Sequence, residues 1–138
     1  MMVSPPRAPE LATAAILGIG TDLFEVERME KEIEESGGRF QDSVFTPGEI
    51  AYCQSKRYPA RHFAVRFAAK EALFKALGGA APPDFWHEVE VEAKDAGAPV
   101  LRLHGRVREV ADGLGVKNVL VSLSHTSGLA AATVVLQG

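Results

Sequence analysis

The 138-residue sequence has a single cysteine and no strong net charge of either sign. One cysteine, Cys53, can form neither an internal disulfide nor a thiolate metal cluster, which excludes disulfide-stabilised secreted scaffolds and zinc ribbons. We therefore expect a reducing, cytoplasmic setting. The formal net charge of −3, without a basic stripe, argues against a nucleic-acid partner.

Long membrane-spanning apolar segments are also missing. The apolar run LATAAILGIG at residues 11–20 is too short to cross a bilayer. It is a poor signal peptide, because Arg7 alone precedes it and the run continues into TDLFEVER. We therefore expect no membrane partner. The polar, proline-bearing start predicts a flexible N-terminal tail over residues 1–13, and residues 14–138 suffice for one domain.

The spacing of apolar residues predicts several helices. Val26, Met29 and Ile33 recur at helical spacing, and the glycines at 37–38 end that helix. TPGE at 46–49 is typical of a helix start, with Thr46 as the cap and Glu49 closing a capping box. Further helices are expected over residues 61–77, ended by Gly78 and Gly79, and over residues 105–113.

The remaining segments are typical of strands. Residues 87–93 alternate with period two, as expected for a half-buried strand. Strands are also expected at residues 14–22, 98–105, 117–125 and 128–137, with turns at 95–97 and at HTSG between the last two. The pattern predicts a compact α+β domain without internal repeats.

The helix expected over 61–77 has no ordinary solvent face. Its bulky stripe is Phe63, Phe67, Leu73, Phe74 and Leu77, and alanines occupy much of the remaining circumference. Such a helix is buried by its own domain, by a partner subunit, or by both.

Four charges nevertheless lie on this helix, at Arg66, Lys70, Glu71 and Lys75. Glu71 and Lys75, at i and i+4, could form a surface ion pair worth a few tenths of a kcal/mol. Burying charges among phenylalanine and alanine side chains costs free energy, however, unless the charges face one another, a metal or a ligand. Lys70 lies close to the bulky stripe, so it either extends past that stripe to solvent or contacts a ligand.

A second carboxylate, Asp22, occurs in GIGTDLFEVERM. This stretch is not a dinucleotide fingerprint, because Leu23 stands where the last glycine is needed, and it lacks the ending of a Walker loop. Asp22 could be the N-cap of the following helix. Alternatively, Asp22 and a carboxylate from another element could bind Mg²⁺, which usually accepts a few carboxylates together with waters and phosphate oxygens.

Three stretches together resemble the small holo-acyl-carrier-protein synthase type of 4′-phosphopantetheinyl transferase: GIGTDLFEVERM, RFAAKEALFKALG and SLSHTSGLAAATVV. The resemblance implies a small antiparallel sheet packed on a long helix. It also implies transfer of the phosphopantetheine arm of coenzyme A to a serine of an acyl carrier protein in fatty acid biosynthesis, with release of adenosine 3′,5′-bisphosphate. Family members use Mg²⁺ and are homotrimers with active sites at subunit boundaries.

The resemblance also implies roles for individual residues. Asp22 and Glu71 match the magnesium ligands, and Lys75 matches the lysine that meets the pyrophosphate. Arg66 and His125 match positions that line the coenzyme A pocket near its 3′-phosphate. Because the carrier protein supplies the nucleophile, the enzyme must stabilise charge on the departing bridging oxygen, which Mg²⁺ and a lysine can do. Either Glu71 or a metal-bound water would take the serine proton.

The helix expected after Asp22 departs from the family pattern. Arg28 matches a carrier-protein contact, but the segment around it has six glutamates and few basic residues. This acidic helix weakens the electrostatic match to an acidic carrier. The partner is then a less acidic carrier domain, such as one within a large synthase, or the contact rests on Arg28 and apolar residues.

Other chemically interesting side chains are expected to have structural roles. His62, His87 and His104 lack metal-ligand spacing, so surface or structural roles are expected. Cys53 is expected to be inert. Trp86 is expected to pack locally, although a loop there could border an adenine pocket.

Two other functional classes remain as alternatives to a transferase. The chain could be a non-catalytic nucleotide- or coenzyme A-binding module, in which Asp22 and Glu71 merely cap and pair. It could also be an interaction protein whose alanine-rich helix only builds an oligomer. Neither class explains the paired carboxylates together with the lysine.

Overall fold

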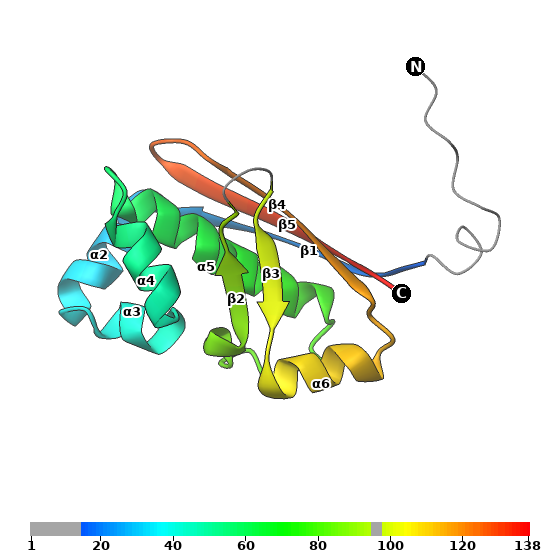
Figure 1. Cartoon of the computed structure of the whole chain (residues 1–138). Coiled ribbons are helices and arrows are strands. Elements are labelled where there is room, and N and C mark those ends of the chain that lie inside the picture. The colour runs from blue at the N-terminus through cyan, green and yellow to red at the C-terminus, as the bar shows by residue number, and fades with distance from the viewer. Residues whose placement is uncertain (1–14, 95–97) are drawn as a thin grey trace, which may run out of the picture.

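The computed structural model describes residues 15–94 and 98–138. The tail expected at 1–13, the start of the strand expected at 14–22 and the turn expected at 95–97 lie outside the described residues. In chain order the elements are β1 (Ile16–Glu25), α2 (Val26–Ser36), α3 (Arg39–Val44), α4 (Pro47–Gln54), α5 (Pro59–Ala76), the 3₁₀ helix η1 (Trp86–Glu88), β2 (Val89–Glu92), β3 (Val100–Leu103), α6 (Gly105–Gly113), β4 (Asn118–His125) and β5 (Leu129–Gln137) (Figure 1).

Two antiparallel sheets pack around one long helix. The strand order of the larger sheet is β1-β5-β4, and β2 pairs with β3 in the smaller one. Alternate residues of β5 (Ala130, Ala132, Val134 and Leu136) are buried on the side that contacts α5. The helix also contacts β2, and β3 contacts β4. The predicted α+β fold, with a small antiparallel sheet on a long helix, is confirmed, and the strands divide between two sheets.

The helix α5 is buried nearly all round. The side chains of Phe63, Leu73 and Phe74 are buried, as are those of the alanines between them. Pro59 stands in its first turn, where a missing N–H is harmless. Past its end, Gly78 has φ +63°, a conformation that favours glycine.

The observed elements differ from the expected ones by a residue or two at several ends, as where β3 begins at Val100 rather than at residue 98, and more clearly in three places. The short helix α3 was not expected at all, since its six residues are too few for a periodic pattern. The strand expected at 87–93 begins only at Val89, because η1 precedes it. The first strand continues through Glu25, so Asp22 lies within it.

The capping box at the start of α4 is confirmed. The Thr46 hydroxyl accepts a bond from the Glu49 backbone N–H at 3.2 Å, and Glu49 Oε1 accepts one from the Thr46 N–H at 2.9 Å. Neither α5 nor any other helix of residues 15–94 and 98–138 has the length and apolar character needed to cross a membrane.

Candidate active site

Glycines on β1 let the strand lie directly against α5. A methyl group at Gly20 would overlap the carbonyl oxygen of Ala72, and one at Gly18 would overlap that of Ala76. The two main chains can approach this closely only because neither glycine has a Cβ. Side chains alternate along a strand, so Asp22 faces the helix as the two glycines do. Its short side chain can therefore reach charges on α5.

Asp22 is paired with a lysine of α5 rather than with a helix end. Its Oδ1 atom accepts a hydrogen bond from Lys75 Nζ at 2.9 Å, and the same nitrogen donates to the Thr21 carbonyl at 3.1 Å. The alternative in which Asp22 caps α2 is wrong, because Glu25 occupies the N-cap position. The surface ion pair considered for Glu71 and Lys75 is also not formed; none of the ion pairs among residues 15–94 and 98–138 joins these two side chains.

Glu71 lies in a partly buried setting beside these groups. Its Oε1 atom accepts a hydrogen bond from the indole N–H of Trp86 at 3.2 Å. Burial raises the pKa of Glu71, the Trp86 bond opposes the shift, and the negative charge of Asp22 raises the pKa further. The two carboxylates therefore repel each other, which favours a cation close to both.

The donor set suits Mg²⁺ better than a metal that needs many protein ligands. No group of three or more His, Cys, Asp or Glu side chains that could hold a metal occurs in the part of the chain that the structure describes. Asp22 and Glu71 supply two hard oxygen ligands from adjoining elements, as Mg²⁺ accepts when waters and substrate phosphates complete its shell. A divalent cation would also relieve the repulsion between them. The residues present thus fit the ion that the resemblance implies.

Arg66 and His125 lie together in a different pocket. This cavity of about 240 Å³ is also lined by Tyr52, His62 and Lys94. Arg66 is only 4% exposed, and its guanidinium carbon stands 4.2 Å from the centre of the Tyr52 ring. Its buried Nε atom has no hydrogen-bond partner among the described residues. A buried, incompletely paired guanidinium beside a cavity is suited to an anionic ligand.

A second histidine shares this pocket. The rings of His62 and His125 lie 5.3 Å apart between centroids, at an interplanar angle of 64°. Burial lowers the pKa of His62 to about 4, and the positive charges of Arg66 and His125 add to the effect. His62 was assigned a surface or structural role from the sequence, and its place in this pocket was missed, because ring packing between distant residues leaves no local signal.

Within one chain the two groups of residues do not form a single crevice. At 100° per residue, Arg66 points about 140° away from Glu71 and about 180° away from Lys75 around α5. The resemblance assigns all three residues to one coenzyme A site, but an isolated chain does not direct them at one place. Arg66 thus lies on one side of α5, and Glu71 and Lys75 lie on the opposite side.

Lys70 follows neither of the two alternatives expected from the sequence. Its side chain is fully buried and paired with Glu49, at 2.8 Å between Nζ and Oε1. Burial lowers the pKa of this lysine, while the charge of Glu49 opposes the shift. Lys70 thus contacts neither solvent nor the candidate site. The thiol of Cys53 is buried too, and burial raises its pKa to about 12, in agreement with an inert cysteine.

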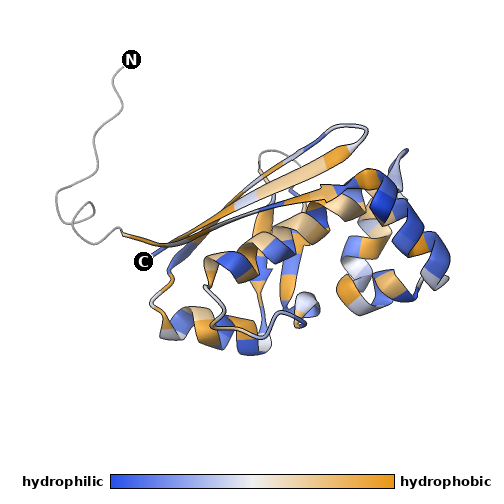
Figure 2. Cartoon of the chain, turned by 180° about the vertical axis from the view of Figure 1, so that it is seen from behind, coloured by the Kyte–Doolittle hydropathy of each residue, from blue (hydrophilic) through white to orange (hydrophobic). Residues whose placement is uncertain are grey.

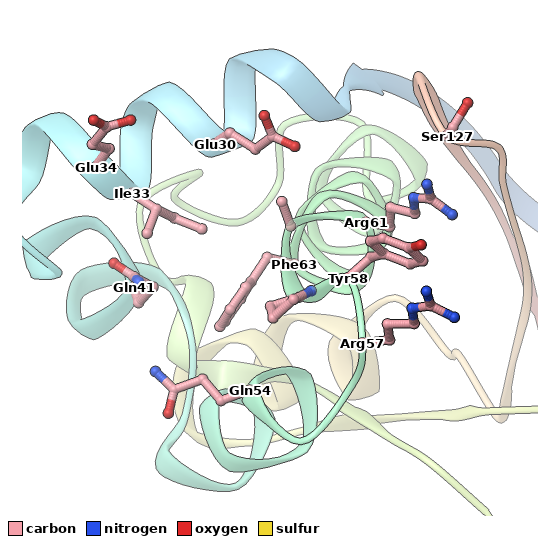
Figure 3. A pocket seen from close by; sticks show the side chains of 12 residues that line it. Glu30, Ile33, Glu34, Gln41, Gln54, Arg57, Tyr58, Arg61, Phe63 and Ser127 are labelled. Carbon is pink, nitrogen blue, oxygen red and sulfur yellow. The ribbon is translucent and has the colours of Figure 1, made fainter.

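A larger cavity, of about 460 Å³, lies beside α2 and the start of α5 (Figure 3). Glu30 and Glu34 line one side of it, and Arg57 and Arg61 line another. None of the six site residues expected from the sequence lines this cavity. Arg28 stacks on the Phe24 ring, with its guanidinium carbon 5.0 Å from the ring centre. The volume of a cavity therefore does not indicate where Asp22 and Glu71 lie.

The chain is similar to known proteins over most of its length. A family model described as ACPS, 4′-phosphopantetheinyl transferase superfamily, matches residues 18–134. A protein of Koribacter versatilis named holo-acyl-carrier-protein synthase is 45% identical over 123 residues, which cover 88% of this chain and 98% of that protein.

Solved structures are similar as well. The crystal structure of holo-acyl-carrier-protein synthase from Neisseria meningitidis has a TM-score of 0.79 and 28% identity, covering 88% of this chain and 98% of that one. The Helicobacter pylori enzyme, solved in complex with coenzyme A, has a TM-score of 0.71 and 29% identity, covering 86% and 98%. The chain therefore belongs to the ACPS family of the 4′-phosphopantetheinyl transferase superfamily.

Proposed function

We propose that this chain transfers the 4′-phosphopantetheine arm of coenzyme A to a serine of an apo acyl carrier protein. The serine oxygen loses its proton to Glu71 or to a water and forms a bond to the β-phosphorus of coenzyme A. The bond from that phosphorus to the bridging oxygen breaks, and adenosine 3′,5′-bisphosphate leaves. The observation that carries the proposal is the meeting of Asp22, Glu71 and Lys75 where β1 contacts α5. The names of the relatives and the family match support it.

In this proposal Asp22 and Glu71 hold Mg²⁺, which would neutralise phosphate charge when bound. Lys75 is suited to stabilise the charge that develops on the leaving oxygen, because its side chain is 56% exposed and carries a positive charge. Before substrate binds, the Asp22 carboxylate holds this ammonium group in place. The lysine is thus oriented toward the site without a buried charge of its own.

We also propose that the working form is a homotrimer, in which a neighbouring copy brings its Arg66 and His125 to the carboxylates. Support comes from the outer face of the larger sheet, where Ile19, Val135 and Leu120 lie in one row across the three strands. Ile19 is 66% exposed and Leu120 is 50% exposed, which is unusual for large apolar side chains on a sheet. Figure 2 shows hydrophobic residues, in orange, along the strands of this sheet. Light scattering that gives a 14.8 kDa monomer at micromolar concentration would contradict this assembly.

The proposed partner is the carrier protein of fatty acid biosynthesis or a carrier domain of a larger synthase, with Arg28 as a contact. The exposed face of α2 is rich in glutamate, and its one ion pair among the described residues, Lys31 with Glu27 at 3.7 Å, neutralises little of it. An acidic carrier would therefore gain little from long-range attraction. A cytoplasmic location stays a prediction.

The test is mass spectrometry of apo-carriers after incubation with coenzyme A, magnesium and the protein. The expected product is a carrier heavier by one phosphopantetheine group, formed by the native chain and not by Asp22→Asn or Glu71→Gln. A binding module would retain coenzyme A affinity yet modify no carrier, and a purely structural oligomer would not bind coenzyme A. Near-native activity of either variant at modest magnesium would contradict the metal assignment.

A further inference from the structure

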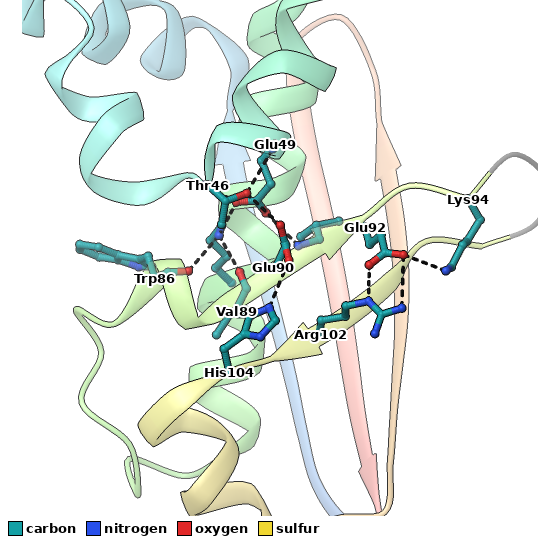
Figure 4. Close-up of polar contacts among 11 residues, drawn as sticks. Thr46, Glu49, Trp86, Val89, Glu90, Glu92, Lys94, Arg102 and His104 are labelled. Atoms are coloured by element: carbon teal, nitrogen blue, oxygen red, sulfur yellow. Dashed lines mark hydrogen bonds and ion pairs between the residues drawn. The ribbon is translucent and has the colours of Figure 1, made fainter.

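Lys70 anchors the segment that carries Trp86. Its buried Nζ atom donates three hydrogen bonds, to Glu49 Oε1 at 2.8 Å, to the Val89 carbonyl at 2.6 Å and to the Trp86 carbonyl at 2.9 Å. The three acceptor residues are labelled in Figure 4. These three bonds use every donor of the ammonium group. The main chain at Trp86 is therefore fastened to α5 by a group that water does not reach.

Glu49 ties the same lysine to two further elements. Its Oε1 atom also accepts the Thr46 N–H at 2.9 Å at the start of α4, and its Oε2 atom accepts the Val91 N–H of β2 at 2.8 Å. A buried ion pair persists only when its remaining hydrogen-bonding groups find partners, as they do here. Helices α4 and α5, strand β2 and the short helix η1 thus meet at one pair of charges.

The side chain of Trp86 points from this anchor to the candidate site. Its indole nitrogen donates to Glu71 Oε1 at 3.2 Å, and its ring packs on Phe67, with centroids 6.0 Å apart at 46°. Phe67 precedes Glu71 by about one helical turn on the same helix. One oxygen of Glu71 therefore accepts a hydrogen bond from Trp86, whose main chain and ring are both held by other contacts. The second oxygen stays available to a ligand.

We propose that Trp86 is a positioning residue, whose indole N–H fixes the Glu71 carboxylate in the orientation that binds a divalent cation. This inference rests on the proposed function, since it takes Glu71 to be a metal ligand. The neighbouring residues Lys70 and Glu71 both bind this tryptophan. Lys70 donates a hydrogen bond to the main-chain carbonyl of Trp86, and Glu71 accepts one from its indole N–H. Hydrogen bonds to metal-ligating groups commonly change metal affinity or activity by about 10- to 100-fold. Local packing alone would not require an indole nitrogen here.

The test measures metal binding without any transfer reaction. Mn²⁺ affinity is determined by electron paramagnetic resonance for the native protein, Trp86→Phe and Glu71→Gln. Phenylalanine keeps an aromatic ring and removes the N–H, so we expect its Mn²⁺ Kd to rise roughly 10-fold or more, with Tm within a few degrees of the native value. We also expect the Mg²⁺ concentration for half-maximal activity to rise while kcat at saturating Mg²⁺ largely recovers. A lower Tm with an unchanged Kd would overturn the proposal.

The single tryptophan gives an independent signal. Mg²⁺ added to the native protein should change the emission of Trp86, and the change should be absent in Glu71→Gln. Native-like Mn²⁺ affinity in Trp86→Phe, together with weak binding in Glu71→Gln, would refute the positioning role and leave the metal site intact. If no carrier is modified yet Trp86→Phe binds Mn²⁺ more weakly, the transferase proposal fails and the positioning role stands. Equal Mn²⁺ affinity in native and Glu71→Gln proteins would overturn both the positioning role and the assignment of Glu71 as a metal ligand.

Discussion

Replacing Lys70 by methionine should destabilise the fold severely, although the two side chains are similar in length. The change removes three hydrogen bonds and leaves the Glu49 carboxylate, 1% exposed, without its counter-ion. Removing one partner of a buried ion pair costs about 3–5 kcal/mol. That is a large part of the 5–15 kcal/mol by which a typical domain is stable. We expect Tm to fall by about 10–20 °C.

The assay is equilibrium unfolding in urea at one fixed protein concentration, since any association would add a concentration-dependent contribution. The double variant Lys70→Met with Glu49→Gln should recover part of the loss, because no unpaired charge then remains. Lys31→Met is the matched control, since Lys31 is 66% exposed in its pair with Glu27 and should cost less than about 1 kcal/mol. A loss below about 1 kcal/mol for Lys70→Met would refute the reasoning.

Three further predictions follow from the packing and the charges. Gly20→Ala should abolish the folded state, because the added methyl group would force β1 away from α5. Gly128→Ala should be tolerated, because no atom lies close to the added methyl group, and thermal unfolding followed by circular dichroism compares the two variants. Lys75→Ala should lower kcat more than it weakens coenzyme A binding, and a change in KM alone would demote the lysine to a binding residue. The pKa of His62 is lowered from 6.5 to about 4 in the folded protein. Between these two pH values the imidazole is therefore protonated in the unfolded chain and largely neutral in the folded one. Stability should therefore fall between pH 6.5 and 4, and less so in His62→Asn; equal slopes in urea unfolding would contradict this.

The sequence predicted the helices and strands better than it predicted the contacts between them. Asp22 and Glu71 were singled out as candidate ligands because two motifs and the chemistry of carboxylates indicate the same ion. Lys70 was misplaced because helical spacing gives its direction around α5 and does not reveal that carbonyl groups of η1 and β2 lie there to receive it. Periodicity cannot predict such long-range partners.

Two further features depend on contacts that a linear pattern does not contain. The bond between Trp86 and Glu71 joins residues 15 positions apart across a loop and a 3₁₀ helix. The separation of Arg66 from Glu71 around α5 follows from the helical angle, but the motif places both beside one ligand. The proposed homotrimer would reconcile the two, because a neighbouring copy would bring its Arg66 to the Glu71 of this chain.

The central position of β5 in its sheet has a consequence for how the protein is made. Thr21 and Thr133, whose hydroxyl oxygens lie 3.3 Å apart, are separated by 112 positions in the chain. At 5–20 residues per second, a ribosome needs about 5–20 s to produce the partner of β1 after β1 itself. During that interval the apolar first strand has no β5 to pair with, and unpaired strand edges promote aggregation. The larger sheet therefore closes only after β5 has left the ribosome, and chaperones that protect a nascent first strand should raise the yield of folded protein.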